Sequence, residues 1–202
     1  MAKKSFQIPK WAWILGVVVL LLGWMVAQYN TLVDLDVAVE NAWADVEVQY
    51  ERRADLIPQL VATVEGAADF EQETLTAVTE ARTNWLDTQA DPNATLEEQM
   101  ASAGAFDSAL SRLLVTVEAY PTITATEGFL TFQAQLEGTE NRVSIAREDF
   151  NAIASDYNRA TRKIPMAFFA NAFGFDESPL FEASEGTEEA PTVEFDFGSD
   201  DE

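Results

Sequence analysis

The chain begins with a long run of apolar residues that no charge interrupts. Residues 11–27 are uncharged, and no acidic residue precedes Asp34. A helix rises about 1.5 Å per residue, so about 20 residues are needed to cross a hydrocarbon core of about 30 Å. Tryptophan and tyrosine side chains near both ends of the run carry the amphipathic rings that favour a membrane–water interface. The pattern predicts a single transmembrane helix over residues 11–29.

A cleavable signal peptide is the alternative interpretation of this beginning. Such a peptide ends in small residues, as in A-x-A, whereas Met25-Val26-Ala27 places a large methionine three residues before the cleavage point. We therefore expect the segment to be retained as an anchor in the cell membrane. Residues 1–10 form a basic tail with three lysines, which predicts a cytoplasmic N-terminus by the positive-inside rule. The rest of the chain is then expected outside, as a periplasmic or extracellular domain.

Downstream of the anchor, apolar residues recur at intervals of three and four, which is typical of amphipathic helices. The first such stripe covers residues 32–64 and predicts a long helix, with a break or bend near residues 29–31 separating it from the anchor. Pro58 is expected to kink this helix, because proline lacks the backbone N–H that a helical turn requires. Gly66 is expected to end or loosen it.

Three further stripes predict three more helices, over about residues 70–88, 96–120 and 129–164. The Asp91-Pro92-Asn93 sequence predicts a turn after the second helix. Thr95, followed three residues later by Glu98, predicts a capping box at the start of the third.

Together these elements predict an all-α fold. A single N-terminal transmembrane helix is followed by an elongated antiparallel up-and-down bundle of about four helices over residues 30–175, because short links join the helices. A polar joint at residues 122–128 precedes the last helix. Gly138 lies within that helix, where glycine costs about 1 kcal/mol relative to alanine. We expect it to mark close helix packing or a local irregularity, with a functional hinge as the alternative.

The end of the chain has two different compositions. Six large apolar residues follow Pro165, and we expect this segment to fold back on the bundle or to dock elsewhere: Phe168, Phe169, Phe173, Phe175, Leu180 and Phe181. Residues 176–202 carry 11 acidic residues and no basic one, which predicts a largely disordered acidic C-terminal tail. Within it, residues 190–195 either belong to a solvated tail or form a short extended peptide for a partner's sheet edge.

Composition narrows the possible functions. The formal net charge is −23, with all 35 acidic residues beyond the anchor, so nucleic-acid binding is not expected and cations or basic partners fit better. The chain has no cysteine and no histidine. Disulfides, thiolate or imidazole metal ligands and histidine-dependent nucleophilic triads are therefore excluded. We assign no catalytic, cofactor-binding or metal-binding residue, and we expect no cofactor.

Carboxylates are the remaining candidates for chemistry. Glu137 and Glu140 lie three residues apart on one predicted helix, and side chains at this spacing share a face. With Glu118 they suggest an alternative function, a carboxylate-based metal-dependent hydrolase of the cell envelope. The structural interpretation, which we favour, places Glu137 and Glu140 on an exposed or salt-bridged helix face with Arg142 and Arg147 nearby. Arg52, Arg53 and Glu118 are expected instead in arginine–carboxylate pairs between helices.

Several runs of this sequence resemble the LemA family. They are YNTLV at 29–33, AWADVEVQYERRADLIP at 42–58, LSRLLVTVEAYP at 110–121, LEGTENR at 136–142, YN at 157–158, FGF at 173–175 and APTVEF at 190–195. The resemblance implies a bacterial protein with one N-terminal transmembrane helix and a long helical bundle. It implies no established enzymatic activity; one relative is associated with the organisation of magnetosome membranes, and others occur beside membrane proteases.

We therefore expect a membrane-anchored helical scaffold rather than an enzyme. Its partners would be the lipid bilayer, through the N-terminal helix, and other proteins or further copies of itself. An accessory subunit of a membrane protease is a further alternative that the sequence leaves open.

Overall fold

The computed structural model describes residues 9–64 and 71–182. Within these ranges the chain is helical and contains no strand, which confirms the predicted all-α fold class. The helices are α1 (Lys10–Val64), α2 (Gln72–Ala90), α3 (Leu96–Glu118), α4 (Pro121–Thr124), α5 (Glu127–Arg162) and α6 (Met166–Phe173). The basic N-terminal tail up to residue 8, Gly66 and residues 183–202, with the 190–195 peptide, lie outside the described residues.

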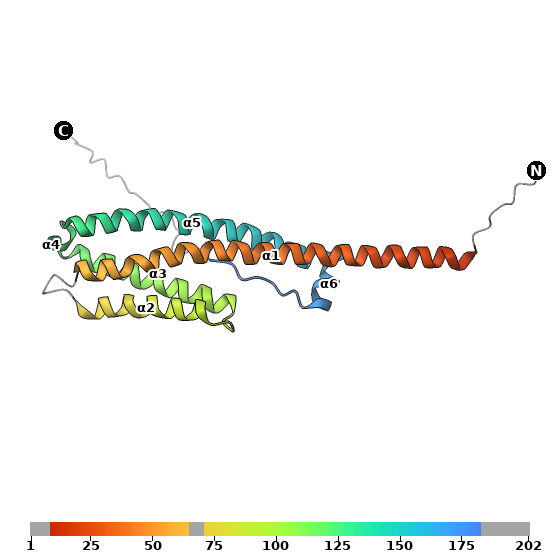
Figure 1. The fold of residues 1–202 in the computed structure, drawn as a ribbon, viewed down its shortest axis with the longest axis horizontal. Helices are drawn as coiled ribbons and strands as arrows, with labels where there is room; N and C mark the ends of the chain where they lie inside the picture. Colours follow the sequence, from red (N-terminus) through yellow and green to blue (C-terminus); the bar gives the residue numbers. More distant parts are fainter. Residues whose placement is uncertain (1–8, 65–70, 183–202) are drawn as a thin grey trace, which may run out of the picture.

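Helix α1 is the longest element and runs without a break from Lys10 to Val64. The predicted bend at Tyr29-Asn30-Thr31 is therefore wrong. None of these residues is proline or glycine, and the Thr31 hydroxyl donates to the Ala27 carbonyl at 2.9 Å, which is compatible with helical geometry. The 55 residues of α1 correspond to a helix about 80 Å long. Figure 1 shows the N-terminal part of α1 projecting beyond the other helices.

Helices α2, α3 and α5 pack along the C-terminal part of α1, while α6 contacts it further toward the N-terminus. Figure 1 shows α5 antiparallel beside α1 and the α2–α3 hairpin covering the end of this pair farthest from the N-terminus. The buried core includes Trp43, Tyr50 and Ile57 of α1, Trp85 of α2, Phe106 and Leu113 of α3, and Phe132 and Phe150 of α5. The spacing of these residues follows the helical period, which is why one face of each helix is buried.

The ends of the helices follow local chemistry. The predicted capping box is confirmed, since the Thr95 hydroxyl accepts from the Glu98 N–H at 3.2 Å and the Glu98 carboxylate accepts from the Thr95 N–H at 2.8 Å. The expected polar joint instead contains the short helix α4, whose Ile123 is buried. Helix α5 ends at Arg162, so Ile164, predicted to continue its apolar stripe, lies outside the helix and is 79% exposed.

Gly138 does not lie at a close helix contact. Apart from its two neighbours and the backbone of its own helical turns, a β-carbon added to it would meet no described atom within 4 Å, so the prediction of close packing at this position is wrong. Pro58 lies inside α1, which continues past it to Val64.

Candidate functional site

A network of charged side chains around the buried Arg53 connects three helices of the bundle. Arg53 of α1 is only 1% exposed, and its guanidinium forms ion pairs with Asp107 of α3 and, at 2.6 Å, with Glu140 of α5. Arg147 of α5 also pairs with Asp107. The Tyr50 hydroxyl donates to Asp107 at 2.7 Å and accepts from Arg147. Three side chains from α1 and α5 therefore surround the Asp107 carboxylate of α3, and Glu140 joins the network through Arg53.

Burial determines the protonation of this network. Desolvation raises the pKa of Asp107 to about 7, the positive charge of Arg53 acts in the opposite direction, and the negative charge of Glu140 adds to the increase. Desolvation also lowers the pKa of Arg147. Both oxygens of Asp107 accept hydrogen bonds, from Arg53 at one and from Tyr50 and Arg147 at the other. The carboxylate thus serves as a structural acceptor that fixes the three helices in register, rather than as a free general base.

The predicted arginine–carboxylate pairing between helices is confirmed at Arg53. Its neighbour Arg52 instead donates to Gln49 of the same helix, at 3.3 Å. Sequence reasoning missed Asp107 as the shared partner. The available signal was its place beside Phe106 on the border of the apolar stripe of α3, where a carboxylate needs a partner.

The three glutamates of the hydrolase alternative do lie at one groove. A cavity of about 620 Å³ is lined by Glu118 of α3 and by Glu137 and Glu140 of α5, together with Leu114, Thr124, Phe129, Gln133 and Leu136. Glu140 is already paired with Arg53. Within residues 9–64 and 71–182, no three carboxylates come close enough together to hold a metal ion.

A second cluster, of aromatic side chains, connects α6 to the projecting part of α1. Phe169 packs edge-on against Trp24 with ring centroids 5.8 Å apart. Phe173 and Phe175 pack against Tyr29, at 5.0 and 5.8 Å. We call this the aromatic junction. The apolar segment after Pro165 therefore folds back on the protein, as expected. It contacts the part of α1 that is predicted to span the membrane.

Beyond the junction, residues 176–182 lie along the bundle as an extended strap. Asn158 donates to the Ser178 carbonyl and accepts from the Ser178 N–H, each at 2.8 Å. Asn151 makes the same pair of bonds with Phe181, each at 2.9 Å. The Phe181 ring stacks on Trp43 and contacts the edge of Phe150. The first seven residues of the predicted acidic tail are thus held by side chains that recur seven apart on α5.

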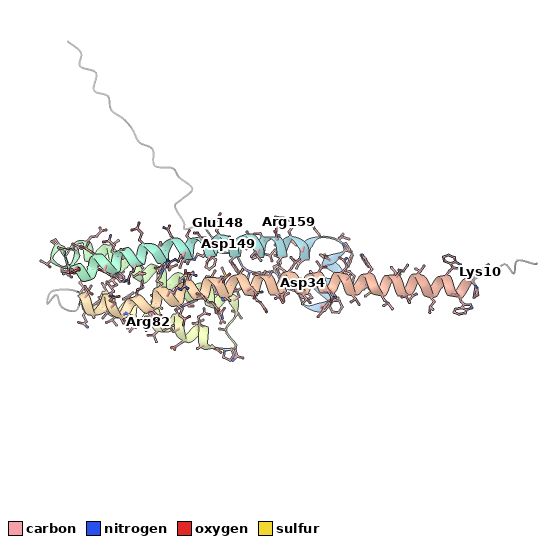
Figure 2. All side chains as sticks on the ribbon, turned by 45° about the horizontal axis from the view of Figure 1, so that its top comes forward. Lys10, Asp34, Arg82, Glu148, Asp149 and Arg159 are labelled. Carbon is pink, nitrogen blue, oxygen red and sulfur yellow. The ribbon has the colours of Figure 1, made fainter. Side chains whose placement is uncertain are left out.

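The membrane-spanning prediction rests on the projecting part of α1. Among the described residues, α1 is the one helix that is long enough and apolar enough to cross a membrane. The most apolar stretch of α1 is not buried by the rest of the protein, unlike the core helix of a soluble protein. Figure 2 labels Lys10 and Asp34, the charged residues that bound this uncharged stretch. A signal sequence would satisfy the same criteria of length and composition.

Comparison with known proteins gives the family. A model of the LemA family matches residues 42–195, which include both the charged network and the strap. The chain belongs to the LemA family. The magnetosome protein MamQ 2 of Paramagnetospirillum magneticum is 27% identical over 186 residues, covering 82% of this chain and 68% of the relative. The protein LemA of Metamycoplasma hominis is 22% identical over 160 residues, covering 79% of this chain and 71% of the relative.

These matches and the apolar helix agree with a membrane-associated protein. The LemA-family match begins at Ala42, within the buried part of α1, so it includes the bundle and excludes the projecting segment. The family match therefore does not itself include the apolar segment of α1.

Proposed function

We propose that this LemA-family protein is a membrane-anchored scaffold whose helical bundle binds other proteins, or further copies of itself, at a fixed position beside the lipid. The observation that carries the proposal is the continuity of α1, in which one helix is both the apolar segment and a core element of the bundle. In such a scaffold no flexible joint separates the membrane anchor from the bundle. The part from Asp34 to Val64 extends about 45 Å from the lipid.

Rigidity of the bundle supports the same proposal. The network around Asp107 ties α1, α3 and α5 together, and the strap adds contacts across α1 and α5. Salt bridges of this type hold a specific register even where their net stabilisation is small. A surface that keeps one shape is suited to binding, because little conformational entropy is lost on association.

The surface charge indicates which partners suit this scaffold. The bundle and tail carry the whole excess of acidic residues, and their field attracts cations or basic protein surfaces and repels nucleic acids. Weak lateral contacts between anchored copies would add up along a membrane, because anchoring raises the effective concentration.

Crosslinking in intact membranes tests the proposal. A short amine-to-carboxyl crosslinker should join the full-length chain to second copies or to a small set of other proteins, through residues of the bundle. Light scattering of the detergent-solubilised chain should show oligomers where self-association occurs. A strictly monomeric chain that crosslinks to nothing, or a purified chain that turns over a substrate at a defined pocket, would contradict a scaffold.

Sidedness has its own test. We propose that the N-terminus is cytoplasmic, so protease added to intact spheroplasts should degrade the acidic domain. Protection of the domain until the membrane is lysed would show the reversed topology.

A further inference from the structure

Helix α6 and its flanks form a second apolar segment that the fold leaves largely uncovered. Residues 164–175 contain no charge. Three large apolar side chains in this short segment face outward, with Ile164 79%, Phe168 70% and Phe173 54% exposed. Exposed apolar groups so close together are unfavourable in water and mark a surface that another apolar phase covers.

The position of α6 identifies that phase. Its Phe169 contacts Trp24, which lies inside the uncharged run of α1, and its Phe173 contacts Tyr29 near the end of that run. Tyr29 lies 18 residues beyond Trp11, or about 27 Å along the helix, so a span that begins at Trp11 leaves the hydrocarbon near Tyr29. Figure 1 shows α6 beside α1 where the bare helix emerges from the bundle. Contacts with α1 therefore hold α6 at the level of the membrane surface.

The basic residues directly before α6 fit this level. The last turn of α5 carries the basic residues Arg159 and Arg162, and Lys163 follows directly. Arg159 and Arg162 pair with Asp156 and Glu177, while the exposed Lys163 has a flexible stem that can extend to a lipid phosphate. An amphipathic segment with basic residues beside exposed phenylalanines is typical of interfacial membrane binding.

We propose that α6 lies in the headgroup region of the bilayer that α1 crosses, with Phe168 and Ile164 inserted among the acyl chains. The protein then contacts lipid at two places, the span of α1 and the interfacial helix α6. Since α6 is joined both to α5 and to the aromatic junction, it fixes the depth and the tilt of the bundle relative to the membrane. The proposal rests on the proposed anchoring by α1.

The absence of cysteine from the chain allows a direct test with single-cysteine variants of the full-length protein. Phe168→Cys and, as a second position outside any helix, Ile164→Cys report on the α6 segment. Val18→Cys reports on the α1 span. Val115→Cys, which is 69% exposed on α3, is the control in the bundle. Each variant carries a polarity-sensitive fluorophore and is reconstituted in vesicles of phosphatidylcholine and phosphatidylglycerol.

Two quenchers then separate the possible environments. We expect a nitroxide on the lipid acyl chain to quench positions 18, 164 and 168 severalfold more than position 115, and iodide in the water to show the opposite order. If iodide quenches positions 164 and 168 while the lipid nitroxide quenches only position 18, the interfacial location of α6 is wrong and the anchor stands. If iodide also quenches position 18, the anchoring itself is wrong. Protection of positions 164 and 168 from both quenchers would show that protein covers α6, which overturns the lipid assignment in favour of a second copy or another partner.

Discussion

Arg53 is the residue whose truncation we expect to destabilise the bundle most. It lies in the core of α1, and its two ion pairs extend to α3 and α5. Removing one partner from a buried charge pair leaves the other charges desolvated without compensation, and this loss exceeds the net contribution of the intact pair. The charge network is therefore expected to show large effects on truncation.

Replacing Arg53 with methionine should destabilise the bundle. The change leaves the partly buried Asp107 without one of its donors, while the exposed Glu140 can turn to water. We expect the free energy of unfolding to fall by about 3 kcal/mol, the lower end of the range for broken buried pairs. Chemical denaturation of the detergent-solubilised protein, followed by circular dichroism, measures this. The neighbouring Arg52→Met is the matched control and should change stability by about 0.5 kcal/mol or less, because Arg52 is exposed. Equal effects at the two positions would show that the network does not hold the bundle together.

Asp107 should make stability depend on pH. Its pKa is about 7 in the folded protein and close to 3.9 when unfolded, so the folded state holds a proton that the unfolded state releases. The stability it contributes is fully present below about pH 4 and is lost as the pH rises through 7. The free energy of unfolding of the wild type should therefore fall, relative to that of Asp107→Asn, between pH 5 and pH 8. A constant or rising difference would mean that the two arginines keep Asp107 ionised throughout.

For the individual helices, local sequence signals mark where several of them begin and end. Thr95 and Glu98 begin α3, and Gly174, with a φ of +77°, ends α6 in the left-handed region that favours glycine. Other positions keep residues that the helix itself does not favour. Gly138 is the clearest of these, since it lies inside α5 with open space around it.

Gly138→Ala should therefore stabilise the protein, by up to about 1 kcal/mol, through the higher helix propensity of alanine. Gly174→Ala is the matched opposite and should destabilise it by about 1 kcal/mol, because a β-carbon is strained at that backbone conformation. Thermal unfolding of the two variants beside the wild type measures both. A destabilised Gly138→Ala would indicate that α5 needs flexibility at this position, which is the hinge interpretation.

The helices were largely predictable from sequence, because their periodic stripes and their caps are local features. The register between them was not, since the meeting of Arg53, Asp107 and Arg147 depends on three helices far apart in the chain. The strap depends on Asn151 and Asn158, whose amides bond backbone groups that no local pattern identifies. The prediction of a break near Asn30 was wrong because tertiary packing outweighs the weak helix propensity of a few polar residues. The packing continues directly beyond Asn30, since Leu32 is fully buried.

In the molecule as a whole, one long helix is both the candidate membrane span and a core element of the bundle. Figure 1 shows the N-terminal part of α1 projecting beyond the other helices, and Figure 2 labels Lys10 near its far end, with Asp149 and Arg159 on the bundle. The aromatic junction and the strap connect the C-terminal part of the chain back to α1. The family membership and the apolar helix both fit a membrane-associated protein.

One distance along α1 measures whether the helix is continuous between the apolar segment and the bundle. Nitroxide labels at Val26→Cys and Val48→Cys, which are 58% and 42% exposed, lie on either side of Asn30 in an otherwise cysteine-free chain. For an unbroken helix, pulsed electron paramagnetic resonance of the reconstituted protein should give one narrow distance distribution near 33 Å. A broad distribution, or one centred at clearly shorter distances, would show a hinge between anchor and bundle and would contradict the account.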